Sequence, residues 1–353
     1  MASTKYKLEH IAELTGHEDR VCPSIQLQAI FNPRPHINSH TKRNTSRLPA
    51  AATLPTLKFT TQSSVPTGHA KTVRCVTWAP SGKTFATASF DANIAIWEQE
   101  SSESDDNESE GGGGGGIDED GVKKGEWECA CLLEGHETEC KSIAYSSSGT
   151  LLASCSRDKT VWVWEVQPDS DFECMGVLMT HTQDVKCVTW HPTEEILASG
   201  SYDNTIKLYI DDPSDDWYDF QTLTGHTSTV WSLAFSPAAP SSLRPPTTKR
   251  LGFGGASRSG GGRACWGGKE EEGTGTDKGL LASTGGDGKI NVWSIKTEGD
   301  AVVSNLIASI EDAHGVSEVN CVSWCPRPGL EHLLASAGDD CSVRIWDLRS
   351  ESQ

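Results

Sequence analysis

The stretch that decides the fold contains two copies of one pattern. Residues 133–166 read LEGHETECKSIAYSSSGTLLASCSRDKTVWVWEV, and residues 178–209 read LMTHTQDVKCVTWHPTEEILASGSYDNTIKLY. The histidines near their starts, His136 and His181, are 45 residues apart. Each copy alternates apolar and polar residues in short runs, as strands do. A repeat of this length indicates a small sheet that buries its faces only by stacking on further copies.

The pattern recurs along the chain with constant internal spacing. In each clear copy an aspartate precedes the closing aromatic residue by six positions: Asp91–Trp97, Asp158–Trp164, Asp203–Tyr209, Asp287–Trp293 and Asp340–Trp346. On these features the chain resembles WD40 repeat proteins. The resemblance implies an all-β fold, a seven-bladed WD40 β-propeller that forms a single domain over residues 1–353. The alternating segment 6–14 is expected to complete the last blade, which would close the ring without a free sheet edge.

The period sets the number of blades. Clear starts occur near residues 17, 69, 136, 181, 226 and 314. A further start near 270 is inferred, because His226 and His314 are 88 residues apart, which equals two periods of 44. With that start the count is seven, although the first blade and the junction between the fifth and sixth are degenerate or interrupted.

Three segments depart from the pattern. Residues 22–61 are locally basic and irregular, and are interpreted as a degenerate blade or a disordered loop rather than a basic partner-binding insert. Residues 98–126 are acidic and rich in glycine, which predicts a disordered loop. Residues 238–278 are rich in Gly, Pro and Ser and are interpreted as a flexible insert; their glycine cluster lacks the Gly-Lys-Ser/Thr ending of a phosphate loop. A gene-model error would also produce the breaks at 22–61 and 238–278.

Composition narrows the class of function. The formal net charge of −19 argues against a direct nucleic-acid binder, which needs a basic surface. No apolar run reaches the roughly 18–20 residues that cross a bilayer, so no membrane partner is expected. Twelve cysteines without a visible secretory signal indicate reduced thiols, and therefore a cytoplasmic or nuclear location.

The recurring polar residues are interpreted as structural. Ser199, His181 and Asp203 have the residue types of a hydrolase triad, but the same trio recurs from blade to blade, so we expect structural hydrogen bonds and no enzyme activity. The predicted network contains His69, Asp91, Trp97, His136, Asp158, Trp164, His181, Asp203, Tyr209, Asp287, Trp293, Asp340 and Trp346.

The cysteines do not predict a metal site. Cys75, Cys187 and Cys321 hold the same position in V-x-C-V-x-W, where a small apolar residue is expected in a first strand. The pairs Cys129–Cys131 and Cys321–Cys325 lack the spacing of zinc knuckles. Buried free thiols, no bound metal and no cofactor are therefore expected.

In propellers the residue before each turn aspartate and the residue at the start of each first strand reach one face, which we call the top face. These residues are Phe90, Arg157, Tyr202, Gly286 and Asp339, together with Arg74, Lys141, Lys186, Trp231 and Asn320. The partner-binding candidates among them are Arg157, Arg74, Lys141, Lys186, Tyr202 and Trp231. Cations beside aromatic rings suit a peptide carboxylate with an aromatic neighbour. Ordinary solvated surface charges are the alternative interpretation.

Longer motifs narrow the resemblance. LEGHETECKS, LLASCSRDKTVWVWEV, GHTSTVWSLAF and DAHGVSEVNCVSWCP together resemble the WD40 subunit of the cytosolic iron–sulfur protein assembly (CIA) machinery. The resemblance covers residues 67–237, apart from the acidic insert, and residues 279–348.

This resemblance implies a scaffold or docking subunit of the CIA targeting complex. Its partners would be a reactive-cysteine adaptor, a helical-repeat adaptor, and apoprotein clients that end in an acidic and aromatic tail. The family's top-face arginine in the SRDK motif corresponds to Arg157. The alternative function is a generic WD40 adaptor in another assembly, such as a ubiquitin ligase or a chromatin complex.

Overall fold

The structure is a computed structural model that describes residues 6–14, 64–99, 126–168, 171–211, 217–237, 276–298 and 301–350. Every regular element within these ranges is a strand. In chain order the strands are β1 (Tyr6–Leu14), β2 (Val73–Trp78), β3 (Thr84–Ser89), β4 (Ile94–Gln99), β5 (Trp127–Leu133), β6 (Cys140–Tyr145), β7 (Leu151–Ser156), β8 (Val161–Val166), β9 (Phe172–Leu178), β10 (Val185–Trp190), β11 (Leu197–Ser201), β12 (Thr205–Asp211), β13 (Trp217–Thr224), β14 (Val230–Phe235), β15 (Thr276–Gly285), β16 (Ile290–Glu298), β17 (Ala301–Ile310), β18 (Val319–Trp324), β19 (Leu333–Gly338) and β20 (Val343–Ser350). The described residues contain no helix long and apolar enough to cross a bilayer.

These strands form five four-stranded antiparallel sheets, in the orders β2-β3-β4-β5, β6-β7-β8-β9, β10-β11-β12-β13, β14-β15-β16-β17 and β1-β20-β19-β18. The last sheet combines the two ends of the chain, with Leu8 opposite Leu348. The prediction that segment 6–14 completes the last blade is therefore confirmed. Joining the first strand to the last blade ties both ends of the chain into one sheet.

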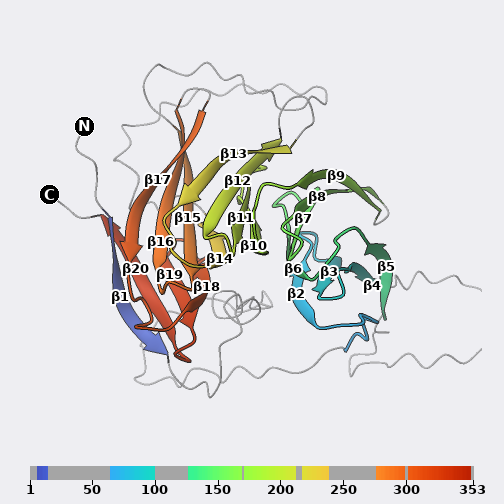
Figure 1. Ribbon diagram of the computed structural model, residues 1–353, viewed down its shortest axis with the longest axis horizontal. Coiled ribbons are helices and arrows are strands. Elements are labelled where there is room, and N and C mark those ends of the chain that lie inside the picture. Colours follow the sequence, from blue (N-terminus) through green and yellow to red (C-terminus); the bar gives the residue numbers. More distant parts are fainter. Residues whose placement is uncertain are drawn as a thin grey trace, which may run out of the picture.

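The sheets are the blades of a propeller. The inner strands β2, β6, β10, β14 and β18 follow one another around a common centre, each beside the next (Figure 1). Apolar side chains fill the space between neighbouring blades: Ile94 and Ile96 of one blade pack with Ile143, Leu152 and Trp164 of the next. All five are at most 5% exposed. Each blade is thus stabilised by burying a face against its neighbour, which explains why the pattern must repeat.

The turn before each third strand has the same geometry in all five blades. The residue after the turn aspartate has a positive φ, with values of 79° at Ala92, 74° at Lys159, 68° at Asn204, 71° at Gly288 and 61° at Cys341. Only one of these residues is glycine, so four blades adopt a conformation that costs free energy. The preceding aspartate offsets this cost, because its carboxylate accepts a hydrogen bond from the backbone N–H two residues further on, as Asp203 does from Thr205 at 3.0 Å.

One predicted blade is wrong. The start inferred near residue 270 assumed two blades between His226 and His314, but β14 pairs directly with β15, from Val230 opposite Gly285 to Phe235 opposite Leu281. The strands described in this interval therefore form one blade, and the insert separates β14 from β15 in the sequence. Chain length alone could not distinguish a blade from an insert of the same length, because only strand pairing does so.

Some expectations lie outside the described residues. The predicted first blade near residue 17 and the irregular segment 22–61 fall within residues 15–63, which the structure does not describe. Most of segments 98–126 and 238–278 is also outside the described part of the chain. At their edges, β4 extends to Gln99 and β15 begins at Thr276.

Candidate functional site

A histidine, an aspartate, a hydroxyl residue and an aromatic residue are linked by hydrogen bonds inside every described blade. In the blade of β10–β13, His181 Nδ1 lies 2.8 Å from Asp203, and His181 Nε2 lies 2.7 Å from Ser199 Oγ. Ser199 Oγ lies 3.1 Å from the hydroxyl of Tyr209. The equivalent sets are His69, Asp91, Thr87 and Trp97; His136, Asp158, Ser154 and Trp164; His226, Asp287, Ser283 and Trp293; and His314, Asp340, Ser336 and Trp346.

These contacts keep the aspartates ionised. Burial alone would raise the pKa of Asp287, but hydrogen bonds from His226 and from the backbone of Thr227 and Lys289 lower it to about 2. The same balance of burial against hydrogen bonds lowers the pKa of the aspartates at positions 91, 158, 203 and 340. Each carboxylate anchors its turn to the loop that carries the histidine, and thereby ties together two loops of one blade.

The surroundings of Ser199 are not those of a catalytic serine. Ser199 is fully buried at 0% exposure, and its hydroxyl lies between His181 and Tyr209. A nucleophile needs an open position beside it for the substrate carbonyl, which a buried serine of this kind does not have. The geometry favours a structural role for this trio.

The blade that ends in tyrosine allows a test of the network. The Tyr209 hydroxyl contacts Ser199 Oγ at 3.1 Å and Thr180 Oγ1 at 2.9 Å. We expect Tyr209→Phe to lower the free energy of unfolding by about 1–2 kcal/mol, because Ser199 loses a buried contact and Thr180 a partly buried one while the ring still packs. Urea denaturation would measure the loss, with Tyr218→Phe on the exposed outer strand as control. Equal stabilities of the two variants would contradict the structural role of the hydroxyl.

The top face is assembled by a backbone hydrogen bond that recurs in every described blade. The N–H of the residue before the turn aspartate donates to the carbonyl of the residue immediately before the start of the inner strand. The pairs are Phe90 with Thr72, Arg157 with Glu139, Tyr202 with Asp184, Gly286 with Thr229, and Asp339 with Glu318. Neighbouring blades therefore place equivalent side chains side by side around the centre.

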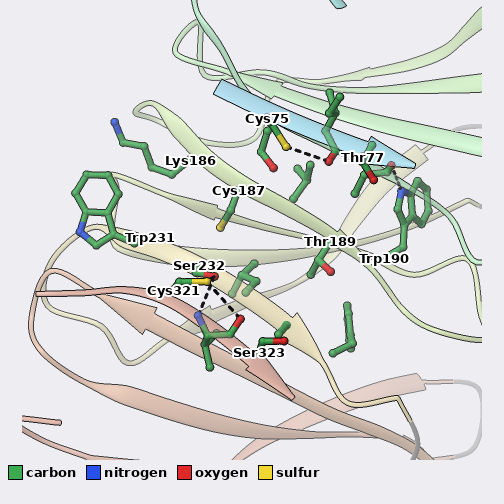
Figure 2. Close-up of a pocket in the computed structure, with 18 of the residues that line it drawn as sticks. Cys75, Thr77, Lys186, Cys187, Thr189, Trp190, Trp231, Ser232, Cys321 and Ser323 are labelled. Atoms are coloured by element: carbon green, nitrogen blue, oxygen red, sulfur yellow. Dashed lines mark hydrogen bonds between the residues drawn. The ribbon is translucent and has the colours of Figure 1, made fainter. Parts of the chain in front are cut away.

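A channel of about 540 Å³ runs between the inner strands, and residues 74, 141, 186, 231 and 320 line it. Figure 2 shows Lys186 and Trp231 at one end of this channel and Trp190 at the other, with Cys187 between them. Of the six predicted partner-binding residues, the structure places Arg74, Lys141, Lys186 and Trp231 in the channel wall. Arg157, Lys141, Lys186 and Tyr202 line a shallower adjoining pocket of about 320 Å³.

The cations of this pocket are paired with carboxylates that the sequence reading did not include. Glu139 contacts Lys141 and lies 3.4 Å from Arg157, while Asp184 lies 3.2 Å from Lys186 and 4.0 Å from Arg157. Hydrogen bonding to Lys141, together with the charge of Arg157, holds the pKa of Glu139 below its usual value. The sequence indicates these ion pairs, since an acidic residue precedes Lys141 and Lys186 by two positions.

The cations also differ in how accessible they are. The side chains of Lys141 and Lys186 are 15% and 13% exposed, and each ammonium group lies against an aromatic ring. Lys141 is 4.2 Å from the ring centroid of Phe90, and Lys186 is 5.3 Å from that of Tyr202 and 5.5 Å from that of Trp231. Arg157 is 58% exposed and Tyr202 is 56% exposed. Arg157 and Tyr202 are therefore more accessible than Lys141 and Lys186.

Two cysteines of the channel, Cys75 and Cys187, are thiols with little tendency to ionise. Burial raises the pKa of Cys75, and it raises that of Cys187 to about 12. Cys75, Cys187 and Cys321 line the channel from three different inner strands (Figure 2). Within the described ranges, no group of three or more His, Cys, Asp or Glu residues is arranged to hold a metal ion.

Comparison with known proteins agrees with this geometry. The family model described as "WD domain, G-beta repeat" matches residues 60–98, 127–165, 172–209, 217–240 and 305–347, which is more than half of the chain. Fold and sequence together define a WD40 β-propeller protein, as the repeat spacing predicted.

Relatives identify the family more closely. A protein of Mycosarcoma maydis named "Probable cytosolic iron-sulfur protein assembly protein 1" is 40% identical, with 98% of this chain and 94% of that protein covered. Proteins of the same name from Cryptococcus neoformans var. neoformans serotype D and Botryotinia fuckeliana are 38% and 32% identical, with 82% of this chain and 85% and 86% of those proteins covered. The chain belongs to the cytosolic iron-sulfur protein assembly protein 1 family, which confirms the resemblance drawn from its motifs.

The alignment with the Mycosarcoma maydis relative is longer than this chain. It runs over 427 positions, whereas this chain has 353 residues, so that relative contains stretches without a counterpart here.

Proposed function

We propose that this protein is a docking subunit of the cytosolic machinery that inserts iron–sulfur clusters into apoproteins. Its relatives are named for cytosolic iron–sulfur protein assembly, and its blades form a scaffold with a chemically distinctive top face. Under this proposal the chain holds a reactive-cysteine adaptor and a helical-repeat adaptor, and presents client proteins to them. The cluster is cargo, and the chain acts in the cytosol and the nucleus.

The exposed guanidinium of Arg157 is the observation that carries the proposal. It lies beside Tyr202 in a pocket whose other cations are largely covered. An arginine in this setting can form two parallel hydrogen bonds to a carboxylate, and an adjacent tyrosine provides a flat apolar contact. A client tail that ends in an acidic residue and an aromatic residue supplies both groups. Glu139 and Asp184 hold the guanidinium in position until such a tail displaces them.

Reversing the charge of Arg157 tests the proposal. We expect Arg157→Glu to weaken binding of a peptide that ends in Asp-Trp by about 1–3 kcal/mol, because it removes the donor and adds a third carboxylate beside Glu139 and Asp184. Isothermal titration calorimetry would measure the change.

The matched control is Arg327→Glu, since Arg327 is an exposed arginine in the turn between β18 and β19, away from the top face. Unchanged affinity in the Arg157 variant would remove the proposed client site. Purification from cells followed by mass spectrometry would test the wider role. Iron–sulfur adaptors among the bound proteins would support it, and ubiquitin-ligase or chromatin subunits in their place would contradict it.

A further inference from the structure

Arg74 lines the central channel without the carboxylate partner that its equivalents have. Arg74, Lys141 and Lys186 each stand second in an inner strand, and all three line the channel of about 540 Å³. Lys141 and Lys186 each contact an acidic residue two positions earlier in the chain. The residue two positions before Arg74 is Thr72, which carries no charge. Within the described part of the chain, the guanidinium of Arg74 forms no ion pair and no hydrogen bond.

This difference leaves an uncompensated charge in the channel wall. Arg74 is partly buried, so its guanidinium has lost part of its hydration. A partly buried charge without a protein partner costs free energy until an anion binds to it. The position therefore favours an anionic ligand more strongly than the positions of Lys141 and Lys186, whose charges are already paired.

The mouth of the channel is polarised around Arg74. Its cations come from the neighbouring strands β2, β6 and β10. The equivalent positions of β14 and β18 are the uncharged residues Trp231 and Asn320, which donate hydrogen bonds to the carboxylates of Glu318 and Asp339. An anion that enters from the top face is therefore attracted to the side of β2, β6 and β10 and repelled from the side of β14 and β18.

The shape of the channel restricts which anion of a protein partner can reach this side. All five inner strands contribute to the wall, and the channel runs from Lys186 and Trp231 at one end to Trp190 at the other (Figure 2). A segment from the middle of a chain would have to pass through the propeller or fold back within the channel. The end of a chain can enter directly from the top face, and the volume is that of pockets which hold small ligands, roughly 300–1,000 Å³.

We propose that Arg74 binds the terminal α-carboxylate of a client tail, while Arg157 binds the acidic side chain of the same tail. This assignment rests on the proposed function. Arg157 is 58% exposed in the shallower pocket, and Lys141 and Lys186 line both that pocket and the channel. The two arginines thus belong to adjoining cavities that one short tail can occupy together. The partner is a protein whose chain stops at its acidic and aromatic residues, and not one that carries them internally.

Three peptides with the same sequence but different ends would test the inference by isothermal titration calorimetry. The first ends in Asp-Trp with a free carboxylate, the second is its C-terminal amide, and the third continues with two glycines. The free acid should bind the wild-type protein about 5- to 20-fold more tightly than either of the others. In Arg74→Gln the free acid should bind only as tightly as the amide. Arg74→Lys should restore part of the preference, since it keeps the charge but not the two parallel hydrogen bonds.

The amide peptide reports whether the Arg74 variants are folded, because its affinity should be the same for them and for the wild type. Lys83→Gln is the matched control, because Lys83 is an exposed cation in the turn between β2 and β3 of the same blade. It should preserve the preference for the free acid. Equal binding of all three peptides to the wild type would overturn the proposal, and so would a preference that survives Arg74→Gln.

The outcome is separable from that of the client site. Arg157→Glu should weaken the free acid and the amide by a similar factor, whereas Arg74→Gln should weaken only the free acid. A preference for the free acid that disappears in Arg157→Glu would place the terminal carboxylate at Arg157 and overturn the assignment to Arg74. Absence of binding by every peptide would reject the client site itself, and the role of Arg74 with it.

Discussion

Replacing Asp203 with alanine is expected to lower the free energy of unfolding by about 3–5 kcal/mol. The carboxylate is 8% exposed and lies 2.8 Å from His181 Nδ1. It also accepts hydrogen bonds from the backbone of Thr182 and Thr205, both at 3.0 Å, and from Thr205 Oγ1 at 2.6 Å. Alanine would leave several of these groups buried or partly buried without a partner. It would also remove the contact that supports the positive φ of Asn204.

Chemical denaturation followed by circular dichroism would measure this loss. Asp219→Ala is a suitable control, because Asp219 pairs with Lys207 on the blade surface and its side chain is 31% exposed. That pair should contribute about 1 kcal/mol or less. Asp203→Asn should have an intermediate effect, since its amide oxygen can still accept hydrogen bonds. A loss in Asp203→Ala no larger than in Asp219→Ala would show that the repeated network contributes little to stability.

Acidification is expected to destabilise the protein steeply below about pH 5. The pKa of all five turn aspartates is lower in the folded chain than the ordinary value near 3.8, and that of Asp287 falls to about 2. A carboxyl with a depressed pKa in the folded state stabilises the fold above its unfolded pKa. That contribution is lost as the pH falls towards the folded pKa. For Asp287 alone it is on the order of 2 kcal/mol.

His314 acts in the same direction. Burial lowers its pKa, so protonation opposes the folded state as the pH falls. Urea denaturation at a series of pH values would show the loss as a decreasing midpoint, and Asp203→Asn should flatten the curve because one of the five carboxyl groups no longer titrates. A midpoint that stays constant between pH 6 and pH 3 would contradict this account. High salt should not restore stability, since buried hydrogen-bonded carboxylates are poorly screened.

At the top face, the sequence predicted the positions of the cations but not their contacts with carboxylates. The repeat identified the positions of Arg157, Lys141 and Lys186, because each occupies a defined place in its blade. It did not predict that Glu139 and Asp184 lie between these cations. The contact between Arg157 and Asp184 crosses from one blade to the next, and such a contact depends on the angle between sheets rather than on spacing within a repeat.

The sequence by itself determined the all-β class, the repeating blade and the constant spacing between residues such as His181 and Asp203. These features follow from local alternation and from a spacing that returns in every blade. Only the tertiary structure decided that β14 pairs with β15 across the insert, and that Arg157 reaches Asp184 of the next blade. Strand pairing and contacts between blades join residues that are far apart in the chain, and no periodic pattern records which distant partners meet.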